Sequence, residues 1–245
     1  MEPIDRDEMG EVWPGVQPGS GPDDLGSATL EGPSSCEVRS FQTLTIRYIA
    51  GRFGLDDTGG IMIAMRWVSD GGTLQTDDPS AMNFVSARSS TGVPLELFVE
   101  PYGYRPWTLA LRISVKGGYI RPGEEIEVTL GDRTGGSPGL RMQTIAEAAL
   151  EFRVSVDACA TGQFSEIPER LAIAVVAGPP HLWRVVGPGL RRPGEPFSIG
   201  IRIEDTWGNP ANPDRHNLRL EGDAITGLPC PVELPDRTGA GTVEG

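Results

Sequence analysis

The residues best suited to bind a ligand lie in one glycine-rich stretch, Gly131 to Thr144 (GDRTGGSPGLRMQT). Arg133 and Arg141 carry planar guanidinium groups that could hold a carboxylate or a phosphate, helped by glycine backbone amides. In the alternative interpretation, Asp132 and both arginines tie a long crossover loop to the sheet, and the glycines adopt positive φ. Because the ending GK[ST] is absent, the stretch is not a P-loop.

A second candidate is the aromatic segment PYGYRPW, Pro101 to Trp107. Tyr104 and Trp107 could stack on a glycan or another small molecule, since aromatic rings and arginine are common at recognition surfaces. The same rings could instead pack in the core or support a loop. The sequence leaves both interpretations open and keeps a carbohydrate-binding or adhesion module as an alternative function.

Oxygen-bearing side chains recur at short spacing near the C-terminal end, at Asp205, Asn209, Asn212 and Asp214. Oxygen ligands at short spacing could hold Ca²⁺, but two prolines interrupt them and the spacing departs from an EF-hand loop. Capping of turns by Asp and Asn side chains explains the same residues. We therefore predict no metal site here.

Conventional catalytic groupings are missing from the sequence. The acid pairs Asp56-Asp57 and Asp77-Asp78 lie in predicted turns, where exposed neighbouring acids are common in an acidic chain. His181 and His216 lie in different parts of the second domain, and no Gly-x-Ser-x-Gly motif occurs. The prediction is that this chain has no catalytic residues, no metal and no cofactor.

Charge and cysteine content narrow the function classes. The formal net charge of the 245 residues is -13 and no basic run occurs, so neither a nucleic-acid partner nor an anionic membrane surface is expected. No signal peptide, transit peptide or apolar run of about 20 residues is present, which makes the cytoplasm the expected location. Three widely spaced cysteines allow one disulfide at most and favour no thiolate metal site.

Alternating apolar residues between turn-rich segments predict an all-β protein. With 33 glycines and 22 prolines, short strands separated by turns at about ten-residue spacing favour antiparallel sandwiches. We predict a flexible lead-in over residues 1–40, a β-sandwich domain over 41–178, and a partial immunoglobulin-like domain over 181–245. The boundary is Gly178-Pro179-Pro180, because each proline biases the preceding residue toward extended geometry.

Strands are expected at 43–50, 60–68, 93–101, 108–118, 124–132, 151–158 and 171–178 of the first domain, and at 182–188, 197–205, 217–222 and 232–234 of the second. The run at 60–68 is apolar on both faces, so it should be a central strand. Residues 108–118 and 124–132 flank a Pro-Gly turn and should pair as a hairpin. Residues 143–152 could form a short helix.

The order of several motifs resembles a known family. The segments GxIxIAMRW, GxxIRPGEEIEVTLGDRTGGSPGLRMQT, VDACATGQF and GEPFSIGIRIEDTWGNP are similar to the amino-terminal half of a large bacterial family of unknown function, catalogued as number three-six-zero-four. The similarity covers about Ile61 to Pro235, and the GDRTGGSPGLRMQT block is its most specific part. The Asp205–Pro210 turn also resembles that of bacterial immunoglobulin-like repeats.

This resemblance implies an accessory role. In that family β domains precede a metal-dependent hydrolase-like domain of the PHP type, and this chain has no His-x-His pair to which such catalytic residues could correspond. We therefore expect a fragment or subunit that scaffolds a hydrolase-like domain or second subunit, with an open sheet edge in its short second domain. The alternative is part of a hydrolase with a site at the Gly131–Thr144 loop.

Overall fold

The computed structural model describes residues 22–66, 70–100, 107–211 and 240–244. Every element in these ranges except one short helix, α1 (Pro22–Leu25), is a β-strand, so the predicted all-β class is confirmed. The chain divides into two compact units, the first comprising residues 1–143 and 147–175 and the second 144–146 and 176–245. No helix among the described residues is long and apolar enough to cross a membrane.

The larger sheet of the first unit is built around one fully buried strand. Its strands are β2 (Ser35–Glu37), β5 (Gly60–Arg66), β7 (Leu95–Glu100), β8 (Trp107–Val115), β11 (Glu147–Asp157), β12 (Ser165–Glu166) and β13 (Leu171–Val176). They follow the order β2-β13-β11-β5-β8-β7, and β12 pairs with β11. The first six residues of β5 are buried, which confirms the prediction of a central strand.

The smaller sheet of this unit has one polar and one apolar face. Its strands are β1 (Gly26–Glu31), β4 (Leu44–Ala50), β6 (Val85–Ser89) and β9 (Glu125–Leu130), in the order β1-β4-β9-β6. Alternate residues of β9 are buried and half-buried, as expected for a strand with one face on the core. The outer face is therefore lined by polar side chains from neighbouring strands.

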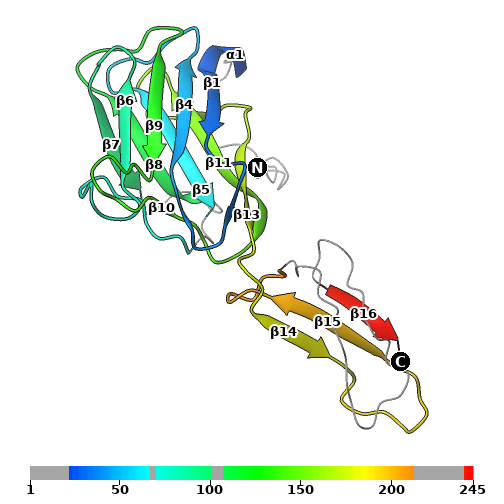
Figure 1. The fold of residues 1–245 in the computed structure, drawn as a ribbon. Helices are drawn as coiled ribbons and strands as arrows, with labels where there is room; N and C mark the ends of the chain where they lie inside the picture. Colours follow the sequence, from blue (N-terminus) through cyan, green and yellow to red (C-terminus); the bar gives the residue numbers. More distant parts are fainter. Residues whose placement is uncertain (1–21, 67–69, 101–106, 212–239, 245) are drawn as a thin grey trace, which may run out of the picture. The chain divides into compact units, whose positions relative to one another are not determined.

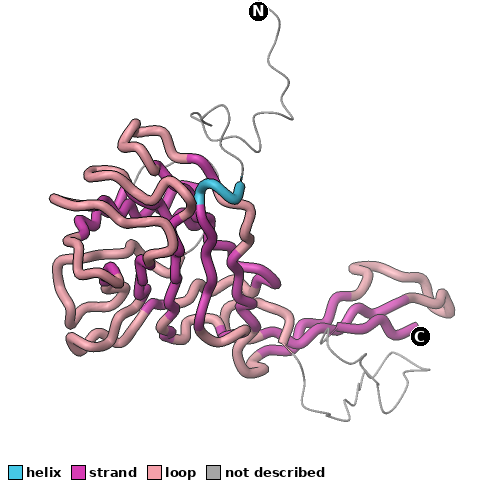
Figure 2. Tube along the Cα trace, turned by 90° about the horizontal axis from the view of Figure 1, so that it is seen from above, coloured by secondary structure: helices cyan, strands magenta, loops and turns pink. Residues whose placement is uncertain are grey.

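The core of the first unit lies between these two sheets, which pack face to face (Figures 1 and 2). Its largest buried side chains come from both inner faces and include Leu44, Ile46, Tyr48, Ile126 and Leu130 from the smaller sheet and Ile61, Ile63, Leu111, Ile113 and Phe152 from the larger one. A short pair, β3 (Phe41–Gln42) with β10 (Leu140–Arg141), adds to the sandwich. This apolar interior supplies most of the driving force for folding.

The second unit contains a three-stranded antiparallel sheet. Its strands are β14 (Leu182–Val186), β15 (Ser198–Glu204) and β16 (Ala240–Glu244), with β15 in the centre. Ile199, Ile201 and Ile203 are buried along one face of β15. The strands predicted at 217–222 and 232–234 lie outside the described residues.

The predicted hairpin between residues 108–118 and 124–132 is wrong. Both segments are strands, but β8 pairs with β5 and β7 in the larger sheet, whereas β9 pairs with β4 and β6 in the smaller one. The Pro-Gly turn between them therefore carries the chain from one sheet to the other. Alternation of apolar residues shows that a strand has a buried face, but it does not identify the neighbouring strand.

The helix considered for residues 143–152 is also wrong. Strand β11 begins at Glu147 and continues to Asp157, and a register break lies between Glu147 and Leu150 where it pairs with β13. The alanines and glutamates of this segment favour a helix locally. Pairing with β13 on one side and β5 on the other outweighs that preference, because both partners are strands of the sandwich.

The structure also corrects the extent of the lead-in predicted for residues 1–40. All six residues of β1 pair with β4, and β2 lies at the edge of the larger sheet. The first unit therefore includes residues 26–37, which belong to both of its sheets. The unit boundary falls between Val175 and Val176, close to the predicted link at Gly178-Pro179-Pro180.

Candidate functional site

The stretch Gly131–Thr144 is a crossover that starts directly after β9. Gly131 has φ 71°, and a Cβ atom at this position would lie 2.1 Å from the Leu140 backbone nitrogen and 2.5 Å from the Gln42 carbonyl oxygen. Only glycine permits this close approach of three backbone segments. The chain then returns through β10, where Leu140 pairs with Gln42.

Asp132 is the buried acid of this crossover, with 9% of its surface exposed. Its carboxylate accepts hydrogen bonds from the Ser86 hydroxyl at 2.5 Å and from the Thr134 backbone N–H at 2.8 Å. Burial alone would raise the pKa of Asp132, but the hydrogen bonds from Ser86 and Thr134 outweigh it and hold the pKa below its ordinary value. The side chain is therefore ionised at neutral pH and fixed in orientation.

The two arginines of the crossover donate to different parts of the unit. Arg133 Nη2 donates to the Phe41 carbonyl oxygen at 2.7 Å, and Arg141 Nε donates to the Gly71 carbonyl oxygen at 3.0 Å. The backbone N–H of Arg141 also donates to Asn83 Oδ1. These bonds favour the interpretation in which the arginines anchor the loop.

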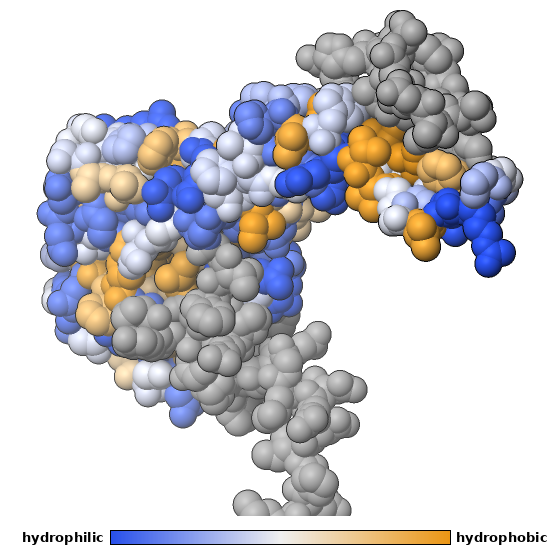
Figure 3. All heavy atoms as spheres, turned by 90° about the horizontal axis from the view of Figure 1, so that it is seen from below, coloured by the Kyte–Doolittle hydropathy of each residue, from blue (hydrophilic) through white to orange (hydrophobic). Residues whose placement is uncertain are grey.

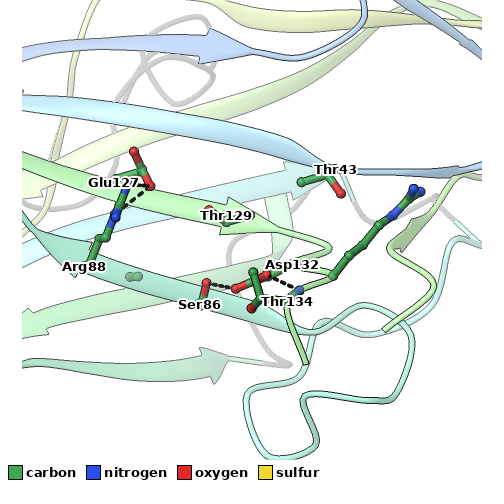
Figure 4. Close-up of a pocket in the computed structure, with 9 residues that line it drawn as sticks. Thr43, Ser86, Arg88, Glu127, Thr129, Asp132 and Thr134 are labelled. Carbon is green, nitrogen blue, oxygen red and sulfur yellow. Dashed lines mark hydrogen bonds and ion pairs between the residues drawn. The ribbon is translucent and has the colours of Figure 1, made fainter. Parts of the chain in front are cut away.

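A pocket of about 760 Å³ brings Asp132 and Arg133 together with side chains of β6 and β9 and with Thr43, which precedes β4 (Figure 4). Its lining residues are Thr43, Ser86, Ala87, Arg88, Glu127, Thr129, Asp132, Arg133 and Thr134. In Figure 4, the hydrogen-bonded group of Ser86, Asp132 and Thr134 lies at one end, and the Arg88–Glu127 pair lies at the other. Arg141 is not among the lining residues, so the two arginines do not converge on this pocket.

The charges around this pocket are paired. Glu127 accepts from Arg88 at 2.7 Å through one oxygen and from Arg47 at 2.7 Å through the other. Arg47 also contacts Glu31 and Glu125 on the same face of the smaller sheet. The pocket therefore combines balanced charges with a group of hydroxyls.

Trp107 packs on the outer side of the larger sheet. It lies against a small buried cluster of Met62, Ala64 and Ala110, and the guanidinium of Arg153 lies 4.4 Å from the centre of its ring. One face of the ring is thereby engaged in a cation–π contact. This placement favours the packing interpretation, while Tyr104 lies outside the described residues.

The candidate calcium residues that the structure describes cap a turn. Asp205 and Asn209 are buried, and the Asp205 carboxylate accepts the backbone N–H groups of Trp207 and Asn209 and the side-chain amide of Asn209. Asn209 in turn donates to the Thr144 carbonyl. Asn212 and Asp214 lie outside the described residues. No group of three or more metal-ligating side chains occurs in the part that the structure describes.

The acid pairs also act in turns. Asp57 accepts the backbone N–H of Gly117, and Asp78 accepts the backbone N–H and the hydroxyl of Ser80. The Asp78 bonds are the local capping bonds expected of Asp in a turn, whereas the Asp57 bond joins two loops 60 positions apart. None of the four acids lines the pocket described above.

The described histidine and cysteines form no catalytic arrangement. The backbone N–H of His181 donates to the Glu204 carbonyl oxygen at 2.7 Å. Cys36 is buried and Cys159 is exposed, and both are thiols. Burial raises the pKa of the Cys36 thiol above its ordinary value, which makes it less reactive. His216 and Cys230 lie outside the described residues.

We expect Arg133→Ala to destabilise the first unit by about 1 kcal/mol, because the Phe41 carbonyl loses its charged donor. Urea denaturation followed by circular dichroism measures the change. Arg88→Ala is a matched control, since this exposed arginine pairs with Glu127, which keeps its second ion pair with Arg47, and it should change stability by less than about 0.5 kcal/mol. Equal losses in the two variants would contradict the anchoring role.

Comparisons with known proteins give little beyond the fold class. No protein-family model matches the chain, and no curated protein sequence matches it. Among solved structures, a cohesin module from the family 33 glycoside hydrolase of Clostridium perfringens ATCC13124 is similar, with a TM-score of 0.35 and 10% sequence identity over 63% of this chain and 99% of that one. At this low TM-score and sequence identity, the similarity gives no information about ligands or partners.

Sequence reasoning found only part of the pocket. Asp132 and Arg133 stood out because they lie in a glycine-rich stretch. Thr43, Ser86 and Thr129 gave no signal, because single hydroxyl residues are common on the outer faces of strands. The register that aligns Ser86 with Thr129, and the bond between Ser86 and Asp132 across 46 positions, could have pointed to them only once the strand pairing was known.

Proposed function

We propose that this chain is a non-catalytic β-sandwich accessory module that binds a hydrolase-like domain through the edge of its three-stranded sheet. Among the described carboxylates, Asp205 caps a turn, Asp57 accepts the Gly117 N–H, and Glu204 pairs with Arg184. The arginines of the most distinctive loop bond to backbone carbonyls of their own unit. These assignments support a structural role for the described polar residues.

The observation that carries the proposal is the exposed apolar surface of β14. Leu182, Val185 and Val186 are 42%, 56% and 69% exposed, whereas the central strand beside them buries three isoleucines. Figure 3 shows hydrophobic side chains gathered on this unit. Natural edge strands usually carry charges or bulges that prevent pairing. The one charged residue of β14, Arg184, is paired with Glu204, which leaves its exposed apolar residues suited to receive a partner strand.

Strand β14 is also an edge within the described part of the chain, since it pairs there with β15 alone. An added strand would bond to its outward N–H and C=O groups and cover the exposed valines. Main-chain bonding of this kind supplies affinity, and the side-chain pattern supplies selectivity. The partner is therefore a polypeptide segment in extended conformation, contributed by the hydrolase-like domain.

The test is co-expression of this chain with a hydrolase-like domain encoded in the same genomic neighbourhood. We expect a one-to-one complex in size-exclusion chromatography with light scattering. Val185→Lys should weaken it at least about tenfold, because a charge at the edge opposes strand addition. Ile49→Lys is a matched control, as Ile49 is 43% exposed on the smaller sheet of the first unit.

Three outcomes would contradict the proposal. The binding surface would be wrong if Ile49→Lys weakened the complex as much as Val185→Lys. A concentration-dependent dimer of the chain alone, lost in Val185→Lys, would replace the hydrolase-like domain by a second copy. Stoichiometric Zn²⁺ or Mn²⁺ in the purified chain would contradict the non-catalytic role and favour the enzyme alternative.

A further inference from the structure

We propose that the pocket on the outer face of the smaller sheet, lined by Thr43, Ser86, Thr129, Asp132 and Arg133, binds an uncharged polyhydroxy compound of monosaccharide size. This inference is independent of the accessory role, because it concerns a different unit and different residues. The pocket volume of about 760 Å³ lies within the range of small-molecule sites.

The wall of the pocket is rigid because sheet register fixes it. Ser86 of β6 lies directly opposite Thr129 of β9, so their hydroxyl side chains point to the same outer face. Thr43 precedes β4, and its hydroxyl donates to the Gly131 carbonyl oxygen at 2.8 Å. Three segments distant in sequence are thereby held around one space before any ligand arrives.

Asp132 and Arg133 add an acceptor and a donor at separate points of the lining. The Asp132 carboxylate accepts hydrogen bonds from Ser86 and Thr134, and an ionised carboxylate has about four acceptor positions in all. The Arg133 guanidinium lies at the Phe41 carbonyl, to which its Nη2 donates, and a guanidinium carries five N–H donors. Different hydroxyls of one polyol can donate to the carboxylate and accept from the guanidinium.

Thr129 adds a hydroxyl that can both donate and accept a hydrogen bond with a ligand. Its side chain is half-buried in the pocket wall, and it forms no hydrogen bond with any described residue. A hydroxyl is both donor and acceptor, so it matches another hydroxyl without requiring a fixed ligand charge. This property favours a polyol over a ligand that offers acceptors alone.

The balance of charge argues against an ionic ligand. Arg88 and Arg133 are matched in the lining by Glu127 and Asp132, and Arg88 contacts Glu127 directly. An anion bound in this pocket would share it with the ionised Asp132. A metal ion would meet one carboxylate already engaged by two hydrogen bonds and another paired with arginine.

The expected affinity is weak. No aromatic ring is among the lining residues, so a sugar ring would find no stacking surface there. Binding would depend on hydrogen bonds exchanged against water, each with a small net gain. We expect dissociation constants of about 1 to 10 mM.

The test is a titration of the isotopically labelled full chain, followed by two-dimensional amide NMR spectra. The probes are methyl glucoside, methyl galactoside, methyl mannoside and myo-inositol, with citrate and sulfate as anionic probes. At least one neutral probe should shift the amides of Ser86, Thr129 and Thr134 in a saturable manner. Thr129→Val, which keeps the shape of the side chain, should weaken that binding about tenfold or more.

Thr29→Val is the matched control, because Thr29 is an exposed threonine of β1, which is separated from β9 by β4. It should leave the affinity unchanged, and both variants should unfold at the same urea concentration as the parent. The proposal is wrong if no neutral probe binds at about 50 mM. Saturable binding of citrate or sulfate alone, or equal binding in Thr129→Val and the parent, would also overturn it.

Discussion

Replacing Asp205 by alanine should destabilise the second unit by roughly 3 kcal/mol while leaving the first unit nearly unchanged. Asp205 is 3% exposed, and its carboxylate accepts four hydrogen bonds. Three come from the backbone N–H groups of Gly178, Trp207 and Asn209, and one comes from the Asn209 side chain. Alanine leaves these donors without their acceptor in a buried setting, which costs more than the loss of one exposed bond.

Hydrogen exchange followed by mass spectrometry measures the two units separately. Peptides covering β14 and β15 should exchange faster in Asp205→Ala, whereas those covering β5 and β8 should keep their protection. Asp57→Ala is the control in the first unit, since Asp57 caps a single exposed N–H and its loss should change stability by under about 1 kcal/mol. Uniform loss of protection across both units would contradict the local role.

The same carboxylate should make the stability of the second unit depend on pH in the acid range. Burial alone would raise the pKa of Asp205, but the hydrogen bonds from Asn209, Gly178 and Trp207 outweigh it and hold the pKa below its ordinary value. Its contribution to stability is therefore complete above the ordinary pKa of about 3.9 and is lost as the pH falls through the lower, folded value. Between about pH 4 and pH 2, the difference in stability between the parent and Asp205→Ala should shrink.

The pH dependence of the parent protein's stability cannot by itself be assigned to Asp205, because a neighbouring acid also contributes to it. The pKa of Glu204 is also lowered, first by its hydrogen bond from Arg184 and then by that from Arg202. Glu204 therefore contributes acid sensitivity of the same sign in both proteins. The difference between the two curves isolates Asp205, and a difference that stayed constant down to pH 2 would contradict its assignment as the titrating cap.

The strands of the sandwich could be predicted because inward-facing positions are occupied by apolar residues, whose spacing can be read in the sequence. The alternation in residues 124–132 and the continuous apolar run at 60–68 follow directly from one buried face and two buried faces, respectively. Strand β6 shows no such apolar pattern, since its residues VSARS are small or polar and only Val85 is buried. It is a strand because β9 offers it a complete set of pairing partners.

The site was harder to predict than the fold for a related reason. Glycine and arginine made the crossover visible, but their roles depended on which backbone carbonyls lay nearby. Those carbonyls belong to Phe41 and Gly71, residues 92 and 70 positions away from the arginines they bind. Local sequence carries no information on such distant pairs without the strand order.

Gly131→Ala should be the most damaging substitution of the crossover, with an expected loss of roughly 3 to 4 kcal/mol from the first unit. The φ angle of 71° already costs an alanine about 1 kcal/mol or more. The added Cβ would also lie 2.1 Å from the Leu140 nitrogen and 2.5 Å from the Gln42 oxygen. Both contacts are to backbone, so relief requires moving residue 131 away from β3 and β10 rather than turning a side chain.

Gly136→Ala separates these two effects within the same loop. Gly136 also has a positive φ, 97°, but no atom lies within 4 Å of the position its Cβ would occupy. Its substitution should therefore cost only the backbone strain, roughly 1 to 2 kcal/mol. Urea denaturation of the two variants measures the difference, which we expect to be about 2 kcal/mol in favour of Gly136→Ala.

The displacement forced by Gly131→Ala would also reach the pocket. Asp132 follows Gly131 directly, and the backbone N–H groups of both residues donate to the Phe84 carbonyl oxygen. The Asp132 carboxylate in turn accepts the Thr134 N–H. Hydrogen exchange at residues 41–42 and 140–142 should therefore increase in Gly131→Ala and stay at the parent level in Gly136→Ala. If the two variants lost equal stability and protection, the crossover would be constrained by its φ angles alone, and the close backbone approach would have no energetic role.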